Sequence, residues 1–145
     1  MIIYIILLWL ASLLFGYSLR FASATNAIGK SISGTDSPRG FQDAITPPWS
    51  TNLALFSYAA SIGAVSYGWY EYGWLTGLGI ILGFLFLVAI NQGILLPKSD
   101  SEHYRRLILS SMGNRYADYM KSGDQIRGSL MGHLLKKLGI PAPGA

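Results

Sequence analysis

Few side chains in this sequence have the type and spacing that chemistry requires. The first to consider are the amide pair Asn91 and Gln92, which lies inside an apolar stretch. Polar groups surrounded by lipid need partners, so we expect hydrogen bonds to another helix or a place at the membrane interface rather than a ligand or ion site. No charged residue accompanies the pair between residues 72 and 97. A proton relay or a carrier of charged substrates normally needs one, which argues against a pump made of this chain alone.

The titratable residues form no catalytic or metal-binding pattern. Glu71 is a lone carboxylate between two tyrosines, whereas general acid–base catalysis calls for a partner group. His103 and His133 are far apart and lack the spacing of metal ligands. The chain has no cysteine, which excludes disulfides and thiolate sites. We therefore predict no catalytic residue, no metal site and no cofactor held by recognisable ligands, while structural lipids remain compatible with such a chain.

The composition is typical of a membrane protein. The 145 residues are 51% hydrophobic and only 12% charged, whereas about a quarter of an ordinary soluble domain is charged. Stretches without any charge cover residues 1–19, 45–70 and 72–97. Each is long enough for the roughly 20 residues that a helix needs to cross a bilayer. We expect an all-α integral membrane protein with three transmembrane helices, namely one lone span followed by a tight helical hairpin.

The boundaries follow from composition. Residues 1–20 form the first span, and we expect it to be retained rather than cleaved because no basic residue precedes Arg20. Residues 21–50 form a cytoplasmic loop that is partly helical, with turn-forming residues from Ser33 to Gly40. Residues 51–97 hold the hairpin, because the short link around Gly73 forces two antiparallel helices.

Residues 98–145 form a cytoplasmic tail with two predicted amphipathic helices. In the first, one face carries Tyr104, Leu107, Ile108, Ser111, Met112, Tyr116 and Tyr119. In the second, one side carries Ile126, Leu130, Leu134 and Leu138. So short a tail is expected to have no substantial core of its own. Its apolar faces therefore cover either the membrane surface or a partner subunit, and the sequence leaves both open.

The basic residues predict the orientation. Arg20 ends the first span, Lys30 and Arg39 lie in the loop after it, and eight more lie in the tail, while the hairpin turn has none. The positive-inside rule then places the N-terminus outside and the C-terminus in the cytoplasm, in a membrane such as the bacterial inner membrane. The net charge of +4 is thus explained by topology rather than by nucleic-acid binding. The expected membrane-interface anchors are Arg20, Trp49, Trp69 and Trp74.

Small residues recur about four positions apart on the predicted spans, a spacing that lets helix backbones approach closely. They are Ser12 and Gly16 in the first span, Ser57, Ser61, Ala64 and Gly68 in the second, and Gly79 and Gly83 in the third. One interpretation is that the two hairpin helices pack on each other through these faces. The other is that one face docks onto another subunit, and the two are compatible.

These patterns provide surfaces for contact and no groups for a reaction. We expect a non-catalytic accessory subunit of a larger membrane complex, such as a respiratory, photosynthetic or membrane-oxidase complex, with larger integral membrane subunits and the lipid bilayer as its partners. Two alternatives stay open. One is a membrane-anchored assembly or recruitment factor, and the other is a small homo-oligomeric channel or transporter with Asn91 and Gln92 on its path.

Overall fold

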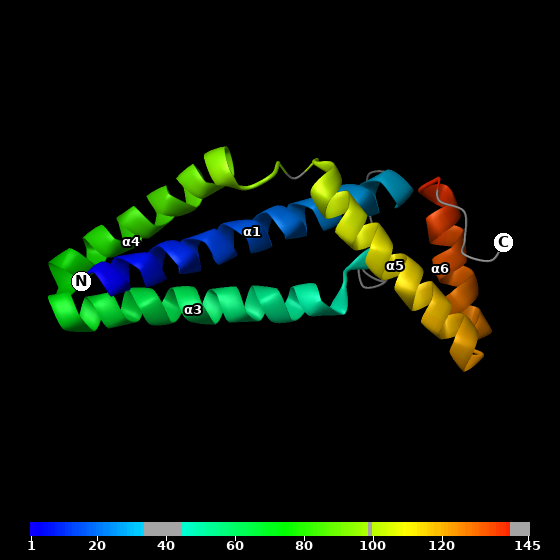
Figure 1. Cartoon of the computed structure of the whole chain (residues 1–145), viewed down its shortest axis with the longest axis horizontal. Helices are drawn as coiled ribbons and strands as arrows, with labels where there is room; N and C mark the ends of the chain where they lie inside the picture. The colour runs from blue at the N-terminus through cyan, green and yellow to red at the C-terminus, as the bar shows by residue number, and fades with distance from the viewer. Residues whose placement is uncertain (34–44, 99, 140–145) are drawn as a thin grey trace. The chain divides into compact units, whose positions relative to one another are not determined.

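The structure is a computed structural model that describes residues 1–33, 45–98 and 100–139. Every regular element in these ranges is a helix, in the order α1, α3, α4, η1, α5 and α6 (Figure 1). The chain divides into two compact units. Unit 1 combines residues 1–22 with 48–98, and unit 2 combines residues 23–47 with 99–145. Most of the loop predicted from Ser33 to Gly40 lies outside the described residues.

Helix α1 (Ile2–Ser33) is a single helix of 32 residues. It continues well beyond residue 20, where the first span was expected to end. Arg20 is a good helix former and does not interrupt it. The apolar residues Phe21 and Ala24, both buried, carry the helix onward. The change at residue 20 is therefore a change of composition and not the end of a helix.

Helix α3 (Pro48–Tyr72) and helix α4 (Trp74–Ile90) form the expected antiparallel hairpin. Proline suits the first position of α3 because the amide it lacks would have no partner there. A single residue, Gly73, links the two helices with φ 86° and ψ 170°. This backbone region is open essentially to glycine alone. The link between the two helices is thus as short as one residue.

Replacing Gly73 with alanine should destabilise the hairpin. The new Cβ would force an L-residue into this backbone region, at a cost of about 1–3 kcal/mol. The measurement is thermal unfolding in detergent, followed by circular dichroism. Gly79→Ala is the matched control, because Gly79 is helical and has open space around its Cβ position. Equal melting temperatures for the two variants would contradict the prediction.

In unit 1 the N-terminal part of α1 packs against both helices of the hairpin. Figure 1 shows it between α3 and α4. The core contains Leu8 and Ala11 of α1 together with Phe84 and Val88 of α4. Phe15 joins the three helices, because its ring lies 5.4 Å from that of Tyr58 on α3 and 5.8 Å from that of Phe84 on α4. The first span thus packs on the hairpin, a point that the sequence left open.

Two of the described helices are long and apolar enough to cross a membrane. They are Ile2–Ser31 within α1 and Trp74–Leu95, which covers α4 and the π-helix η1 (Asn91–Leu95). Helix α3 has 25 residues and is long enough, but it does not reach the same apolarity. Its hydroxyl-bearing residues, such as Ser57 and Ser61, lower its hydropathy.

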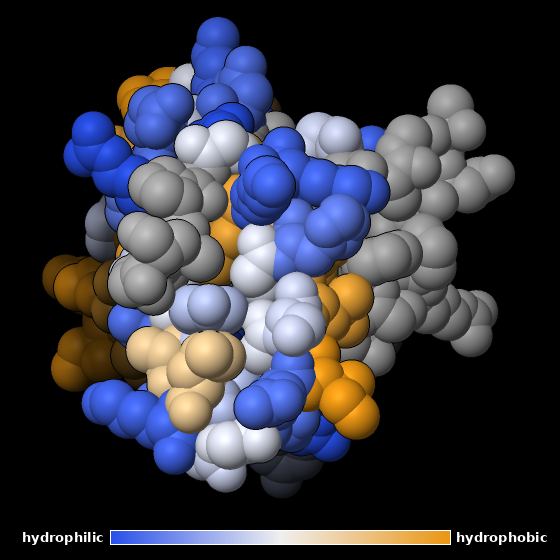
Figure 2. All heavy atoms as spheres, turned by 90° about the vertical axis from the view of Figure 1, so that its right-hand side faces the viewer, coloured by the Kyte–Doolittle hydropathy of each residue, from blue (hydrophilic) through white to orange (hydrophobic). Residues whose placement is uncertain are grey.

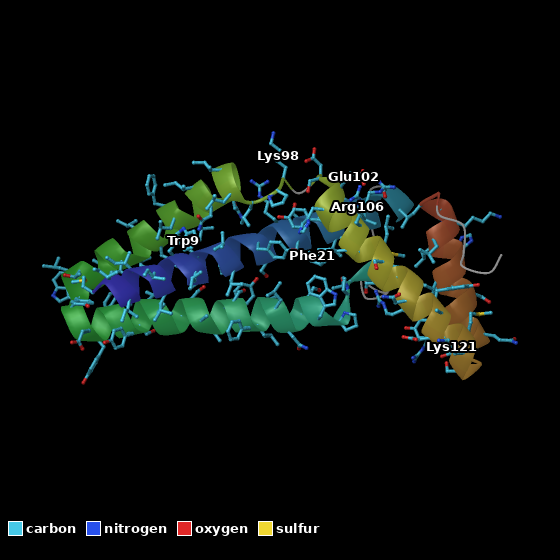
Figure 3. The ribbon with its side chains drawn as sticks, in the orientation of Figure 1. Trp9, Phe21, Lys98, Glu102, Arg106 and Lys121 are labelled. Carbon is cyan, nitrogen blue, oxygen red and sulfur yellow. The ribbon has the colours of Figure 1, made fainter. Side chains whose placement is uncertain are left out.

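Unit 2 contains the two expected tail helices, α5 (Glu102–Ser122) and α6 (Gln125–Lys137). Gly123 ends α5 in the left-handed conformation, with φ 78°. Asp124 then caps α6, because its carboxylate accepts a hydrogen bond of 3.2 Å from the Arg127 amide. On α5 the buried residues are Tyr104, Ile108 and Met112, as the spacing predicts. Figure 3 labels Glu102, Arg106 and Lys121 along this helix.

The predicted apolar side of α6 is only partly buried. Leu134 is fully buried, but Ile126 is 86% exposed and Leu130 is 45% exposed. The buried face is instead formed by Gly128, Met131, Leu134 and Leu135. On the face that Figure 2 shows, hydrophilic side chains predominate and hydrophobic patches lie among them.

Two glycines explain the rotation of α6. A Cβ on Gly128 would lie 3.0 Å from the Met120 sulfur, and one on Gly132 would lie 3.0 Å from the Tyr116 ring. The missing side chains thus allow close approach of α5, and α6 turns this face inward. Gly128 and Gly132 have the same four-residue spacing as the glycines of the third span. This glycine spacing is visible in the sequence. The buried side of α6 was predicted from its large apolar residues alone, and that prediction is therefore only partly right.

Candidate functional site

A polar seam joins α1 to the C-terminal end of the hairpin. Ser12, Gly16 and Arg20 are four residues apart on α1, and this spacing places them on one face of a helix. They face Asn91 and Gln92, which begin η1. We call these five residues the polar seam. The small residues of the first span therefore bond to the amide pair of the third span. The sequence pattern alone gave no sign of this pairing.

The innermost contact of the polar seam pairs Asn91 with Ser12. The Asn91 amide nitrogen donates to the Ser12 hydroxyl oxygen at 2.9 Å. The Ser12 hydroxyl donates in turn to the Trp9 carbonyl oxygen at 2.6 Å. Both side chains are buried, with exposures of 0% for Ser12 and 1% for Asn91. A buried amide without a hydrogen-bond partner costs the full free energy of its desolvation. The bond therefore favours the one register of α1 and η1 in which Asn91 meets Ser12.

The second contact pairs Gln92 with Gly16. The Gln92 side-chain amide donates to the Gly16 carbonyl oxygen at 3.3 Å. A Cβ on Gly16 would lie 3.1 Å from the Leu96 methyl carbon and 3.4 Å from the Gln92 side chain. Gly16 therefore lets η1 come close enough for its side chains to reach the backbone of α1.

The third contact involves Arg20 and the widened turn of η1. The Leu96 amide donates to the Asn91 carbonyl oxygen at 2.8 Å, which is the five-residue bond of a π-helix. The next such donor would be residue 97, but Pro97 has no amide hydrogen. The Gln92 carbonyl oxygen instead accepts a bond of 3.0 Å from the Arg20 guanidinium. A cation at a helix C-terminus also interacts favourably with the helix dipole.

The bond between Ser12 and Asn91 should contribute measurably to stability. We expect a coupling free energy of about 0.5–1.5 kcal/mol, the usual net contribution of one hydrogen bond. A double-mutant cycle with Ser12→Ala, Asn91→Ala and both together, measured by unfolding in detergent micelles, gives this value. The matched pair Ser66→Ala and Asn91→Ala should show no coupling, because Ser66 is exposed on α3. Additive effects of Ser12→Ala and Asn91→Ala would contradict the assignment.

The predicted small residues of the second span lie inside unit 1. Ser57, Ser61 and Gly68 are buried, and Ala64 is half-buried. Both serine hydroxyls bond within their own helix, Ser57 to the Ala54 carbonyl at 2.8 Å and Ser61 to the Ser57 carbonyl at 2.6 Å. The Ala64 carbonyl accepts a bond of 2.7 Å from the Tyr4 hydroxyl of α1. This face therefore packs inside the chain.

The predicted glycines of the third span point the other way. Gly79 and Gly83 are exposed, and a Cβ at either position would meet nothing within 4 Å. The close contact of the hairpin is made by Gly77, whose Cβ position lies 2.6 Å from the Trp69 ring. Helix α4 thus carries two small-residue faces, one used inside the chain and one open.

The predicted interface anchors lie in different surroundings. Trp49 is 42% exposed, and its ring lies 5.0 Å from that of Phe21, which Figure 3 labels on α1. Trp69 packs on Gly77, and Trp74 is exposed. Arg20 donates a hydrogen bond to the Gln92 carbonyl oxygen, so it joins two helices in addition to ending an apolar stretch. The bond between these residues had no signal in the sequence, because it depends on the π-helical turn.

The geometry of the polar seam favours helix association over a reaction. Hydrogen bonds from Asn91, Gln92 and Arg20 join α1 to the end of the hairpin, and the polar seam contains no carboxylate or histidine. Across residues 1–33, 45–98 and 100–139, no three His, Asp or Glu side chains gather where they could hold a metal ion. Comparison with models of protein families, with curated proteins and with solved structures finds no match for this chain.

Proposed function

We propose that this chain is a three-span membrane protein that serves as a non-catalytic accessory subunit of a larger membrane complex. The open face of α4 carries this proposal. Gly79 and Gly83 have the spacing that permits close helix contact, yet no residue of the described chain occupies the space around them. Large apolar side chains flank them, among them Leu75, Leu82 and Phe86, all exposed. Such a face suits a helix of another subunit.

The proposal takes α3 as the second of the three spans. Its 25 residues extend over about 37 Å, more than the roughly 30 Å of a bilayer core. Its buried serines bond to backbone carbonyls of the same helix, so they add no unpaired hydroxyl to the membrane. Outward-facing residues such as Leu55, Phe56 and Ile62 are apolar. Helix α3 therefore suits a position beside two more apolar helices.

The proposed orientation has the N-terminus and Gly73 outside and the basic tail in the cytoplasm. The natural chain has no cysteine, so a single introduced cysteine reports one position without ambiguity. Cysteines at Glu71 and at Ser122 should be labelled from opposite sides of the membrane by an impermeant reagent. Labelling from the same side would overturn the three-span topology.

The proposed partner is a larger integral membrane subunit, of the kind found in respiratory, photosynthetic or membrane-oxidase complexes. A tagged chain purified in mild detergent should bring such subunits with it in a fixed ratio. Gly79→Leu together with Gly83→Leu should abolish this association and leave the chain helical, since the open face has room for both side chains. The control is Ala89→Leu, which adds a leucine at another exposed position of α4 and should keep the association. A self-associated oligomer that conducts ions in liposomes would overturn the proposal.

A further inference from the structure

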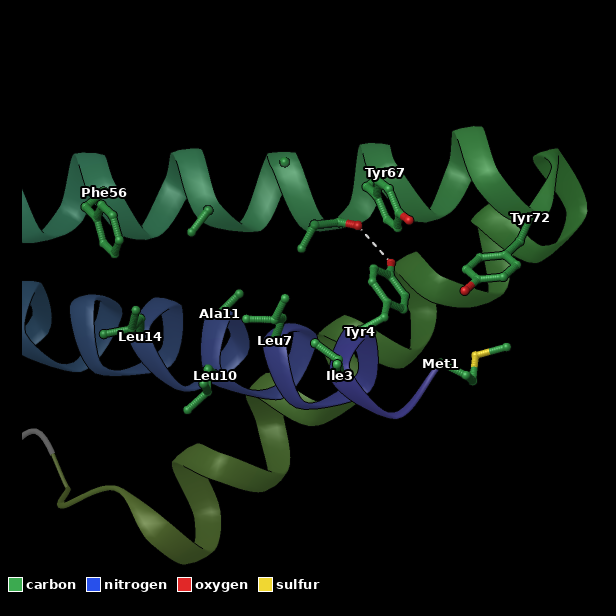
Figure 4. Close-up of a pocket in the computed structure, with 13 residues that line it drawn as sticks. Met1, Ile3, Tyr4, Leu7, Leu10, Ala11, Leu14, Phe56, Tyr67 and Tyr72 are labelled. Atoms are coloured by element: carbon green, nitrogen blue, oxygen red, sulfur yellow. Dashed lines mark hydrogen bonds between the residues drawn. The ribbon is translucent and has the colours of Figure 1, made fainter.

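A long cavity lies in unit 1 between the first half of α1 and the middle of α3. It has a volume of about 670 Å³ and opens to one side. Leu7 and Leu14 of α1 and Phe56 of α3 form its walls, while Ala11 and Ala60 leave it wide. Figure 4 shows these residues on the two helices, with Tyr4 bridging them by its bond to the Ala64 carbonyl.

We propose that this cavity binds one acyl chain of a membrane phospholipid. The inference rests on the proposed three-span arrangement, in which the cavity opens toward lipid. Aliphatic and aromatic side chains make up its walls, and an apolar cavity of this kind does not hold water well. A hydrocarbon chain is the most abundant apolar ligand at this position in a bilayer.

The dimensions of the cavity suit an acyl chain. The lining of α1 extends from Ile3 to Leu14, about 17 Å along the helix axis. The volume of about 670 Å³ is spread along this length, and a thin, flexible hydrocarbon chain can follow it.

The length and the aromatic end both fit one membrane leaflet. One leaflet of the hydrocarbon core is about 15 Å thick, close to the extent of the cavity. Tyr4, Tyr67 and Tyr72 lie together at the end nearest the hairpin turn (Figure 4), with ring centres 5.6 and 5.9 Å from Tyr4. Tyrosine rings prefer the level of the lipid headgroups. An acyl chain would thus begin beside the tyrosines and extend toward Leu14 and Phe56.

Glu71 is the charged side chain of the turn, and no Lys or Arg lies between residues 40 and 97. The acyl chain, and not the headgroup, is therefore the part of the lipid that the cavity is proposed to bind.

The test fills the cavity with side chains. Gly63 lines it and has nothing within 4 Å of its Cβ position, so Gly63→Leu should block the cavity without disturbing the fold. Ala60→Leu is an independent second variant. Ser66→Leu adds a similar side chain to an exposed position of α3 outside the lining and serves as the control. Circular dichroism verifies that all variants are helical.

Native mass spectrometry of each purified chain, after a delipidating detergent wash, counts the bound phospholipid. We expect one phospholipid per chain for the natural sequence and for Ser66→Leu, and its loss from Gly63→Leu and Ala60→Leu. Loss from the natural sequence, or equal retention by all four chains, would overturn the inference. Association with larger subunits is measured separately. If the natural chain associates with larger subunits but retains no phospholipid, only the inference about the cavity is contradicted. If it retains phospholipid but associates with no larger subunit, only the proposed function is contradicted.

Discussion

Replacing Arg20 with leucine should destabilise unit 1 by up to about 1.5–3 kcal/mol, because it removes a hydrogen bond from a charged donor to a part-buried carbonyl. The reason is local. The Leu96 amide already bonds to Asn91, and Pro97 offers no amide hydrogen, so Arg20 is the donor that reaches the Gln92 carbonyl. Its loss should loosen the last turn of the hairpin on α1, which Asn91 and Gln92 still hold through their own bonds. Unfolding in detergent gives the total effect, and hydrogen exchange at residues 92–96 localises it.

Arg20→Lys is the matched control. Lysine keeps the positive charge and one donor, so it should retain part of the stability, although it lacks the planar guanidinium. If Arg20→Leu and Arg20→Lys unfold at the same temperature as the natural chain, the carbonyl is satisfied in another way and the role assigned to Arg20 at η1 is wrong.

Gly68→Leu should have a comparable or larger effect, because it overfills the contact between all three helices of unit 1. A Cβ at this position overlaps the Tyr4 hydroxyl and lies 2.6 Å from a methyl carbon of Ile80. Overpacking of this kind costs about 1–3 kcal/mol. Displacement of Tyr4 from the Ala64 carbonyl adds about 0.5–1.5 kcal/mol. Thermal unfolding of the purified chain in detergent measures the sum.

Two further variants separate these contributions. Tyr4→Phe removes the hydrogen bond and keeps the ring, so it should show the smaller part of the loss alone. Gly63→Leu places the same new side chain five positions earlier on α3, where the space is open, and should leave the melting temperature nearly unchanged. A loss for Gly63→Leu as large as that for Gly68→Leu would show that leucine destabilises α3 wherever it is placed, and would contradict the role assigned to Gly68.

The sequence was a good guide wherever the signal was local. The spacing of Tyr104, Ile108 and Met112 predicted which face of α5 is buried, because one helix turn decides it. The short link at Gly73 predicted the hairpin for the same reason. The end of α1 was harder to place. Arg20 ends the apolar stretch, but a charged side chain leaves the backbone hydrogen bonds of the helix intact, so the helix continues to Ser33.

Contacts between distant segments were beyond a single sequence. Gly77 and Gly79 look alike in the chain, and the packing of Trp69 decides which of them faces inward. The bond from Arg20 to Gln92 joins positions 72 residues apart. It exists because the π-helical turn leaves one carbonyl without a backbone donor, and one sequence carries no record of that turn.

The serine bonds of α3 have a consequence for how the chain enters a membrane. Because Ser57 and Ser61 bond to carbonyls of their own helix, α3 brings satisfied hydroxyls into lipid before it meets any other helix. It is nevertheless less apolar than α1 or the helix that follows Gly73. Under the proposed topology, we expect α3 and α4 to leave the insertion machinery as a pair. A chain truncated at Gly73 should then fail to keep α3 across the bilayer, although α1 inserts normally.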